Sequence, residues 1–147
     1  MKISHTTLEF RTKKEFDFID LTQEVEKFIE ESKIKNGFIN IQTLHTTAPL
    51  FLNENEPLLL KDFKAHLEKL SPKSANYHHN DFTRRTVNIC QDECMNGHAH
   101  CQALHLPSNL MLNIINNKLQ LGRWQRVFLV ELDKAKLRKV QIQIMGE

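Results

Sequence analysis

The strongest constraint on the fold lies near the end of the chain, where apolar residues occupy both faces of one extended stretch. Side chains alternate across a strand, and between residues 127 and 132 apolar residues stand at odd and at even positions alike. A strand of this kind has to be covered on both sides. Residues 140–144 instead alternate strictly between apolar and polar, which predicts a strand with one buried face. The chain is therefore expected to be built around β-sheet.

A first helix is predicted after Asp20. Gln23 stands three residues beyond it, as in a capping box, and apolar residues follow at helical spacing. We expect this helix to run to about Lys35, with Gly37 in the position that follows a helix end.

A second helix is predicted after Asn53. Glu56 stands three residues beyond it, and Pro57 is tolerated in a first turn because the N–H that it lacks would have no partner there. One apolar stripe then continues to residue 70, and Ser71-Pro72 is expected to end the helix.

The remaining segments predict strands and one short helix. Residues 3–20 indicate two strands joined at Lys13-Lys14, residues 38–44 another strand, and residues 98–106 a short helix. Asn116-Asn117 is expected to turn between two late strands. Because strands and helices do not alternate strictly, the expected class is α+β: a largely antiparallel β-sheet or sandwich with about three interposed helices, in a single compact domain over residues 1–147.

Charge and cysteine content argue against several classes of protein. Twenty Lys and Arg stand against 18 Asp and Glu, a net charge of +2, so neither a nucleic acid nor a membrane surface is predicted as partner. The N-terminus has no apolar leader, and the three Cys form an odd count. The simplest prediction is a reduced, cytoplasmic protein.

Histidine is the unusual residue of this chain. Five of its eight His lie between His78 and His105, in polar, turn-rich segments where binding residues tend to lie. Neutral imidazole is the commonest metal ligand, and with Asp or Glu it suits a divalent ion such as Zn²⁺. Cys90 and Cys94, with the histidines that follow them, offer a competing structural zinc site, although their spacing differs from the usual Cys pair.

Other common catalytic signatures are missing. The sequence contains neither a phosphate-binding glycine loop nor a serine nucleophile elbow. Arg84-Arg85 and Arg123 remain as candidate anion anchors, because a guanidinium pairs well with phosphate oxygens. A solvated loop pair is the simpler interpretation of Arg84-Arg85. Trp124, the only Trp, is either a core residue or a platform for a substrate.

Several short motifs agree in order and spacing with those of one family. These motifs are His45-Thr46-Thr47-Ala48, Asn53-Glu54, Asp62, Tyr77-x-His79, Asn96-Gly97-His98-Ala99-His100, Leu121-Gly122-x-Trp124-Gln125, Glu131-x-Asp133 and Arg138. On these residues the chain resembles the YjbQ-like family, also called the secondary thiamine-phosphate synthase family. Residues 105–109 depart from the pattern, because relatives more often carry small and glycine residues there.

The resemblance implies a compact α+β fold, commonly assembled as a trimer, and bound metal in some relatives. It also implies an activity that joins a pyrimidine methyl diphosphate to a thiazole phosphate and releases pyrophosphate. Such a displacement needs no protein nucleophile. The charge of the leaving group has to be neutralised, and a divalent ion together with a cation such as Arg123 can do this.

The candidate site residues fall into three groups. The expected ligands of a divalent ion, zinc or magnesium, are His45, His79 and His100, where the matching family positions also carry His. The candidates for orienting the ligands or for proton transfer are Glu54, Asp62, His98 and Glu131. The expected substrate contacts are Thr46, Thr47, Asn53, Asn96, Arg123, Trp124 and Gln125.

Three functions stay open on the sequence. They are a metal-dependent enzyme of the thiamine-phosphate synthase type, a metal-dependent hydrolase or other transferase acting on another small phosphorylated molecule, and a non-catalytic protein that binds metal or small anions. A homotrimer with sites near its subunit boundaries is also expected. The strand at 127–132 would then be covered by a neighbouring subunit, which would also bring His79 toward His45 and His100. The alternative is a monomer whose own helices cover the sheet.

Overall fold

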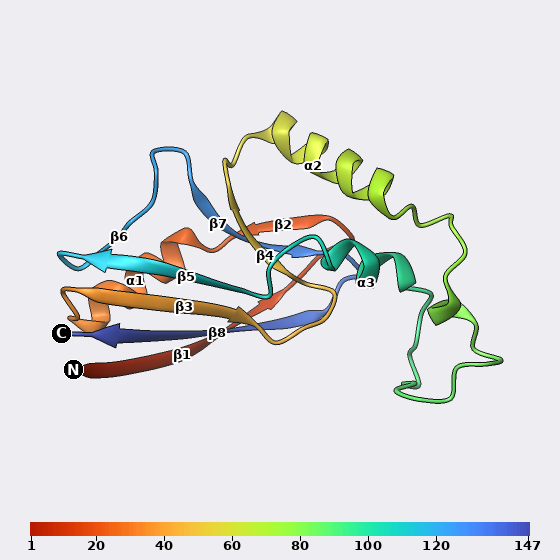
Figure 1. Ribbon diagram of the computed structural model, residues 1–147, viewed down its shortest axis with the longest axis horizontal. Coiled ribbons are helices and arrows are strands. Elements are labelled where there is room, and N and C mark those ends of the chain that lie inside the picture. The colour runs from red at the N-terminus through yellow and green to blue at the C-terminus, as the bar shows by residue number, and fades with distance from the viewer.

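The computed structural model describes residues 1–147, which form two antiparallel sheets and three α-helices (Figure 1). The order of the five-stranded sheet is β1 (Lys2–Arg11), β8 (Leu137–Gly146), β3 (Gly37–Thr43), β5 (Asn109–Ile115) and β6 (Lys118–Leu119). The order of the three-stranded sheet is β2 (Asp17–Asp20), β7 (Arg126–Glu131) and β4 (Leu50–Asn53). The helices are α1 (Thr22–Ser32), α2 (Pro57–Leu70) and α3 (Gly97–Ala103), with a short 3-10 turn η1 (His78–Asn80). The expected α+β class is confirmed.

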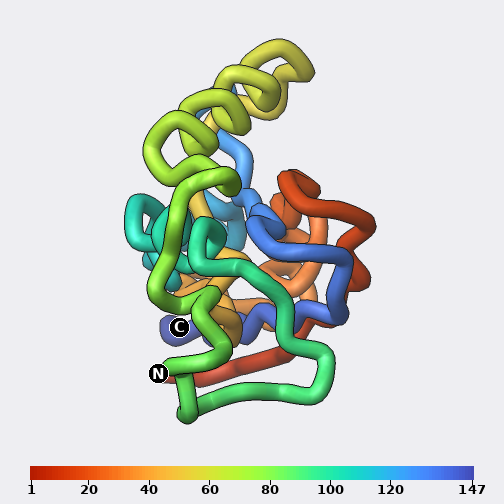
Figure 2. The backbone as a smooth tube through the Cα atoms, turned by 90° about the vertical axis from the view of Figure 1, so that its right-hand side faces the viewer, coloured from red at the N-terminus to blue at the C-terminus, as the bar shows by residue number.

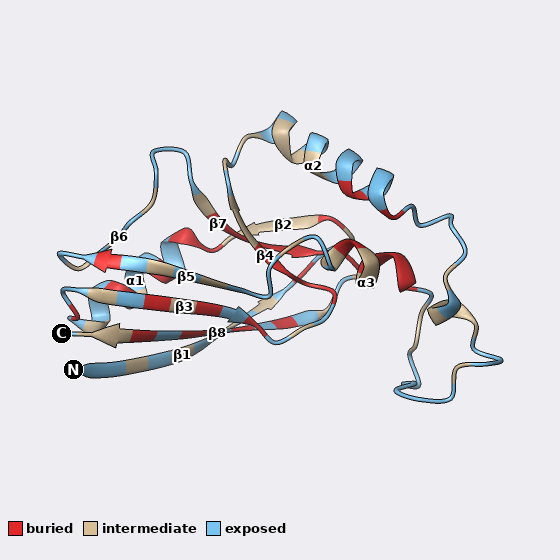
Figure 3. Cartoon of the chain, in the orientation of Figure 1, coloured by how far each residue is buried: buried red, intermediate tan, exposed pale blue.

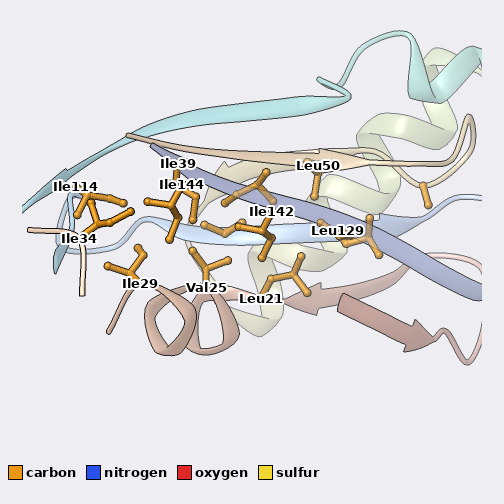
Figure 4. Packing of buried hydrophobic residues seen from close by; sticks show 14 residues of the cluster. Leu21, Val25, Ile29, Ile34, Ile39, Leu50, Ile114, Leu129, Ile142 and Ile144 are labelled. Atoms are coloured by element: carbon orange, nitrogen blue, oxygen red, sulfur yellow. The ribbon is translucent and has the colours of Figure 1, made fainter. Parts of the chain in front are cut away.

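The main core lies between the five-stranded sheet on one side and α1 with β7 on the other. Val140, Ile142 and Ile144 of β8 are buried and Lys139, Gln141 and Gln143 between them are exposed, as their alternation predicts. Figure 4 shows Ile142 and Ile144 of this strand beside Val25 and Ile29 of α1 and Leu129 of β7. One face of the sheet is thus closed by elements of the same chain.

Strand β7 is covered on both faces. Val127 and Leu129 belong to the main core, whereas Val130 belongs to a second cluster that includes Leu67 of α2 and Ala99 of α3. The predicted burial of both faces is confirmed. The expectation that a neighbouring subunit must supply the second layer is wrong, because α2 and α3 of the same chain supply it.

The start of α1 differs from the predicted capping box. The helix begins at Thr22, with Leu21 at its N-cap and no side-chain cap. Asp20 is the last residue of β2, and its carboxylate accepts the backbone N–H and the hydroxyl of Thr22 at 3.0 and 2.6 Å. Pairing of Asp20 with Phe128 of β7 keeps Asp20 in the strand, so the helix starts later.

The start of α2 is likewise set by a different residue. Glu56, and not Asn53, caps the helix: its carboxylate oxygens accept the backbone N–H groups of Leu58 and Leu59, each at 2.8 Å. The longer Glu side chain reaches these amides from the adjacent position. Asn53 therefore ends β4, while Pro57 takes the predicted place in the first turn.

Gly37 is needed for close packing of strands and not for ending a helix. Lys33 adopts the left-handed conformation after α1, with φ 57°. Gly37 opens β3 and faces Gly146 of β8, where a Cβ on Gly37 would collide with the carbonyl oxygen of Met145. The prediction that Gly37 follows the helix end is therefore wrong.

Replacing Gly37 with alanine is expected to lower the free energy of unfolding by about 1–3 kcal/mol, the usual cost of overpacking. The colliding atom belongs to the backbone, so β3 and β8 would have to move apart. Gly122→Ala is a matched control, because a Cβ there meets only the Gln125 side chain, at 3.3 Å. Urea unfolding measures both variants, and unchanged stability of Gly37→Ala would contradict the close approach.

Residues 71–96 lead from α2 to α3 by a long irregular path, as their polar composition predicts. Figure 2, which looks from the right-hand side of Figure 1, shows this segment looping out and returning to α3. Figure 3 shows that most of the segment and most of α2 are exposed.

None of the helices combines the length and the apolar character that crossing a bilayer requires.

Candidate functional site

A polar cavity of about 730 Å³ lies where the segment before α3 meets α3 itself. Its lining residues are Thr46, His78, His79, Arg85, Val87, Asn88, Glu93 and His100. The volume lies within the range of small-molecule sites. Two of the three expected imidazole ligands and one expected substrate contact, Thr46, thus meet within a single chain.

The His79 and His100 rings lie side by side in the lining of this cavity. Their centroids are 4.6 Å apart with an interplanar angle of 61°. The Asn80 side chain holds η1 against α3 by accepting the backbone N–H of Gly97 at 2.9 Å. No neighbouring subunit is needed to bring His79 to His100.

Each ring has one property that suits a metal ligand. Burial, reinforced by the adjacent His79 ring, lowers the pKa of His100 and favours the neutral imidazole with its lone pair. His79 Nε2 is buried and has no hydrogen-bond partner. A buried polar atom without a partner is costly, so this nitrogen is suited to an added ligand.

His45 lies next to the cavity but faces a different partner. Its Nε2 accepts the backbone N–H of Lys139 at 2.7 Å, and burial together with the Arg138 charge lowers the pKa of the ring. A neutral imidazole has one donor and one acceptor nitrogen, so Nδ1 carries the proton. Only the adjacent Thr46 lines the cavity.

These observations fit a divalent metal in part. His79 and His100 supply two nitrogen donors side by side, whereas no three His, Cys, Asp or Glu side chains come close enough to hold a metal ion. For His45 to become the third ligand, its ring has to release the Lys139 N–H.

The cysteines do not form the competing zinc site. Cys90 is exposed, and all three Cys are free. The Cys94 thiol donates to Asp133 at 3.3 Å, and burial and this hydrogen bond raise its pKa. No three His, Cys, Asp or Glu side chains lie close enough together to hold a metal ion, so the cysteines and the histidines that follow them are not assembled into a zinc site.

Arg85 is tightly held at the cavity wall, in contrast to the solvated pair that the sequence favours. Its side chain is only 13% exposed and forms an ion pair with Glu93 at 2.8 Å. It also donates to the carbonyls of Val87 and Asn88 at 3.3 and 2.6 Å. Because the cavity wall is built on these contacts, Arg85 belongs to the site.

Glu131 lies at the centre of a buried network behind the cavity. Arg138 donates to both of its carboxylate oxygens at 2.6 Å, and the Thr12 hydroxyl and the Asp133 backbone N–H donate at 3.0 and 2.9 Å. These four donors saturate a carboxylate, which leaves no free lone pair for proton transfer. The geometry supports a positioning role for Glu131.

Two expected substrate contacts belong to the same network. Arg138 also donates to the Thr47 hydroxyl at 3.0 Å, and the Asn96 amide donates to Asp133 at 3.1 Å. Both side chains are buried. Thr47 ties the loop between β3 and β4 to β8, and Asn96 ties the start of α3 to Asp133, just after β7. Thr47 and Asn96 thus hold in place the loop that carries Thr46 and the start of α3, and Asn96 Oδ1 has no hydrogen-bond partner.

His98 lies on the inner side of α3, away from the cavity lining. Its ring is buried, and Nε2 lies 2.9 Å from the Glu15 carboxylate. Glu15 also pairs with Lys73 at 2.6 Å. His98 therefore fastens α3 to the loop between β1 and β2, while its Nδ1 has no partner.

The remaining candidates lie elsewhere in the chain. Glu54 follows β4 and Asp62 lies exposed on α2, and neither lines the cavity. Asn53 borders a separate, largely apolar cavity of about 110 Å³ beneath α2. These three residues are not brought to the histidines within one chain.

The loop between β6 and β7 carries the other expected substrate contacts, at the end of the molecule opposite α3 (Figure 1). Trp124 is 61% exposed, which excludes a core role, and Arg123 lies over its ring at 4.8 Å. Gln125 closes the loop by accepting the Gly122 N–H at 2.8 Å. Arg123 therefore does not reach the histidine cavity of its own chain.

The sequence indicates Arg84-Arg85 only as a pair of candidate anion anchors, and it gives no reason to place Glu93 at the site. The doublet Arg84-Arg85 was visible, but nothing in the sequence distinguishes which arginine is buried. The signal that could have found the pair is an arginine and a glutamate, eight positions apart, in an irregular segment flanked by histidines.

Comparison with known proteins gives one consistent result. A family model described as UPF0047 protein YjbQ-like matches residues 6–147. A UPF0047 protein of Methanothermobacter thermautotrophicus is 32% identical over 147 residues, covering 100% of this chain and 95% of the relative. The UPF0047 protein YugU of Bacillus subtilis is 31% identical over 143 residues, covering 95% of this chain and 98% of the relative.

Solved structures agree with this result. A YbjQ-like protein of unknown function from Sulfolobus solfataricus superposes with a TM-score of 0.89 at 31% identity, covering 99% of both chains. A yjbq/upf0047 family protein of Clostridium acetobutylicum gives a TM-score of 0.83 at 32% identity, covering 95% of this chain and 99% of the other.

Proposed function

The chain belongs to the YjbQ-like UPF0047 family, and from that premise we propose that it is a metal-dependent enzyme acting on small phosphorylated molecules. The reaction that we propose joins a pyrimidine methyl diphosphate to a thiazole phosphate, with release of pyrophosphate, as in secondary thiamine-phosphate synthases. The observation that carries the proposal is the unpartnered His79 Nε2 beside the His100 ring in a polar cavity.

The residues of the cavity have distinct roles in this proposal. His79 and His100 hold a divalent ion, zinc or magnesium, with His45 as the third ligand once its ring releases the Lys139 N–H. The ion supplies positive charge that stabilises a departing diphosphate. Thr46 contributes a hydroxyl that hydrogen-bonds the substrate. The Glu131–Arg138 pair keeps the loop that carries His45 and Thr46 in position.

Turnover of the two thiamine precursors tests this proposal. Purified protein is incubated with both precursors and either Zn²⁺ or Mg²⁺, and thiamine phosphate is measured by chromatography. We expect product with metal and none after chelation, with recovery when metal is restored. If no product forms with any divalent ion while metal binds at the histidines, the synthase assignment is wrong.

Two other functions remain alternatives for the same cavity. A metal-dependent hydrolase or transferase would release phosphate from a panel of phosphorylated metabolites in a chelator-sensitive way without forming thiamine phosphate. A non-catalytic protein would bind metal or anions and turn over none of the panel. The same assay mixtures, analysed for phosphate, separate these outcomes.

The free state of all three Cys supports the cytoplasm as the place of action.

We also propose a homotrimer, now on a different physical argument. The outer face of the five-stranded sheet carries exposed apolar side chains: Ile3 of β1, Phe38 of β3 and Met111 of β5. Ile3 and Phe38 both pair with Met145 of β8, so they form a row across three strands. Exposed apolar rows of this kind indicate contacts between proteins, and closed symmetry limits the assembly.

Light scattering tests the assembly. We expect a mass about three times 17.3 kDa for the native protein and a shift toward the single-chain mass for Phe38→Asp, because burying an unpaired carboxylate is costly. Leu104→Asp is the matched control, since Leu104 is exposed at the end of α3. A native mass near 17.3 kDa with metal present would exclude the trimer.

A further inference from the structure

The Arg85 guanidinium retains donors that its own chain does not use. A guanidinium has five N–H groups, and Arg85 spends three of them on Glu93, Val87 and Asn88. Two of these three acceptors are neutral carbonyls. The side chain is nearly buried and lines the cavity, so its remaining N–H groups are directed by a rigid frame and not by a flexible arm.

The other groups of the cavity favour an anion. His78, His79 and His100 offer ring nitrogens, Thr46 offers a hydroxyl, and Val87 is the only apolar lining residue. Glu93 is the only carboxylate that lines the cavity. Both of its oxygens are occupied, by Arg85 at 2.8 Å and by the Cys90 backbone N–H at 3.2 Å. The free Arg85 N–H groups can only donate, and the Thr46 hydroxyl and the imidazole N–H groups can also donate to an anion.

We propose that Arg85 is the anchor for phosphate oxygens in this cavity, and that Glu93 holds it in place while competing with the anion. Guanidinium binds two phosphate oxygens at once through parallel N–H groups. The identity of the ligand as a phosphorylated molecule rests on the proposed function. Arg85 then takes the part that the sequence assigns to Arg123, whose loop lies at the other end of the chain.

Substitutions of Arg85 and Glu93 test this proposal, because they are expected to change the affinity for an anion in opposite directions. Arg85→Gln removes the anchor, whereas Glu93→Gln removes the competing charge and retains an oxygen that accepts the Cys90 N–H. A phosphate anchor requires weaker binding in the first variant and tighter binding in the second. A purely structural role for the pair requires weaker binding in both, because both variants break the same ion pair. Arg84→Gln is the control, since Arg84 is exposed beside Arg85.

Isothermal titration calorimetry of the chelator-treated full chain with inorganic pyrophosphate, and separately with inorganic phosphate, measures this. We expect Arg85→Gln to weaken binding of the tighter anion at least about tenfold, from the loss of charge-assisted hydrogen bonds. We expect Glu93→Gln to tighten it several-fold and Arg84→Gln to leave it unchanged. Tighter binding of pyrophosphate assigns the anchor to the diphosphate group, and tighter binding of phosphate assigns it to the phosphate monoester.

Three results would overturn the inference: no binding by the native chain, equal losses in Arg84→Gln and Arg85→Gln, or weaker binding in Glu93→Gln. The proposed function is tested separately by turnover. Anion binding that depends on Arg85 without any turnover would exclude the proposed enzymatic function and support Arg85 as the phosphate anchor. Turnover that is indifferent to Arg85→Gln would remove the anchor and keep the enzyme.

Discussion

Replacing Arg138 with methionine is expected to lower the free energy of unfolding by about 3–5 kcal/mol, because it leaves a buried carboxylate without its charge partner. Arg138 and Glu131 have side chains only 6% and 0% exposed, joined at 2.6 Å. Without the guanidinium, Glu131 retains only the Thr12 hydroxyl and the Asp133 backbone N–H. Chemical denaturation followed by circular dichroism measures the loss.

The double variant Arg138→Met with Glu131→Leu is the control for this prediction. Removing both charges together is often close to neutral, so the double variant is expected to recover a large part of the lost stability. If Arg138→Met alone unfolds within about 1 kcal/mol of the native protein, the range of an exposed ion pair, the buried network does not hold the site as described.

Replacing His100 with alanine is expected to remove most of the bound metal and, with it, turnover. A site with three protein ligands has none to spare, and only His45 and His79 of the proposed ligands would then remain. His105→Ala is the matched control, because His105 is exposed just beyond α3 and lies outside the cavity lining. Metal analysis of the purified variants measures occupancy, expected at about one ion per chain in the control.

The same measurement on His79→Ala and His45→Ala tests the ligand set. All three variants are expected to lose metal severely. Full occupancy in His45→Ala alone would show that its hydrogen bond to Lys139 persists and that another group completes the site. Full occupancy in all three would contradict the metal assignment.

The sheet architecture could be predicted because its signal is local. Alternation over residues 140–144 depends only on neighbouring positions, and the strand that it predicts is present as β8. The turn at Asn116-Asn117 is also a local property: both residues have positive φ, 53° and 60°, which asparagine tolerates better than most residues. These predictions are confirmed.

The layer over β7 could not be predicted, because its origin is not local. Apolar residues on both faces of β7 indicate that both faces are covered, but they do not indicate that α2 and α3 of the same chain form the second layer. The predicted starts of α1 and α2 were wrong for a similar reason. Asp20 is kept in β2 by pairing with β7, and a capping pattern in the sequence has no information about that pairing.

The histidines of the candidate site could be predicted from the sequence. The buried wall that Arg85 and Glu93 form beside them could not. His79 and His100 could be singled out from their motifs, and the fold places their rings together. Arg85 could be named only as one of a pair of candidate anion anchors, because burial of its guanidinium depends on Glu93 and on two carbonyls of one irregular segment. Burial can be predicted from a sequence where apolar residues recur at a regular spacing, and this segment has no such spacing.

We propose that the cavity between η1, α3 and residues 85–93 is the functional site. A crystal structure of the protein with Zn²⁺ and pyrophosphate, using anomalous scattering to locate zinc, tests it most directly. We expect zinc bound by His79 Nε2 and His100, with phosphate oxygens on the Arg85 guanidinium. Zinc bound at Cys90 and Cys94 with pyrophosphate outside the cavity would contradict it.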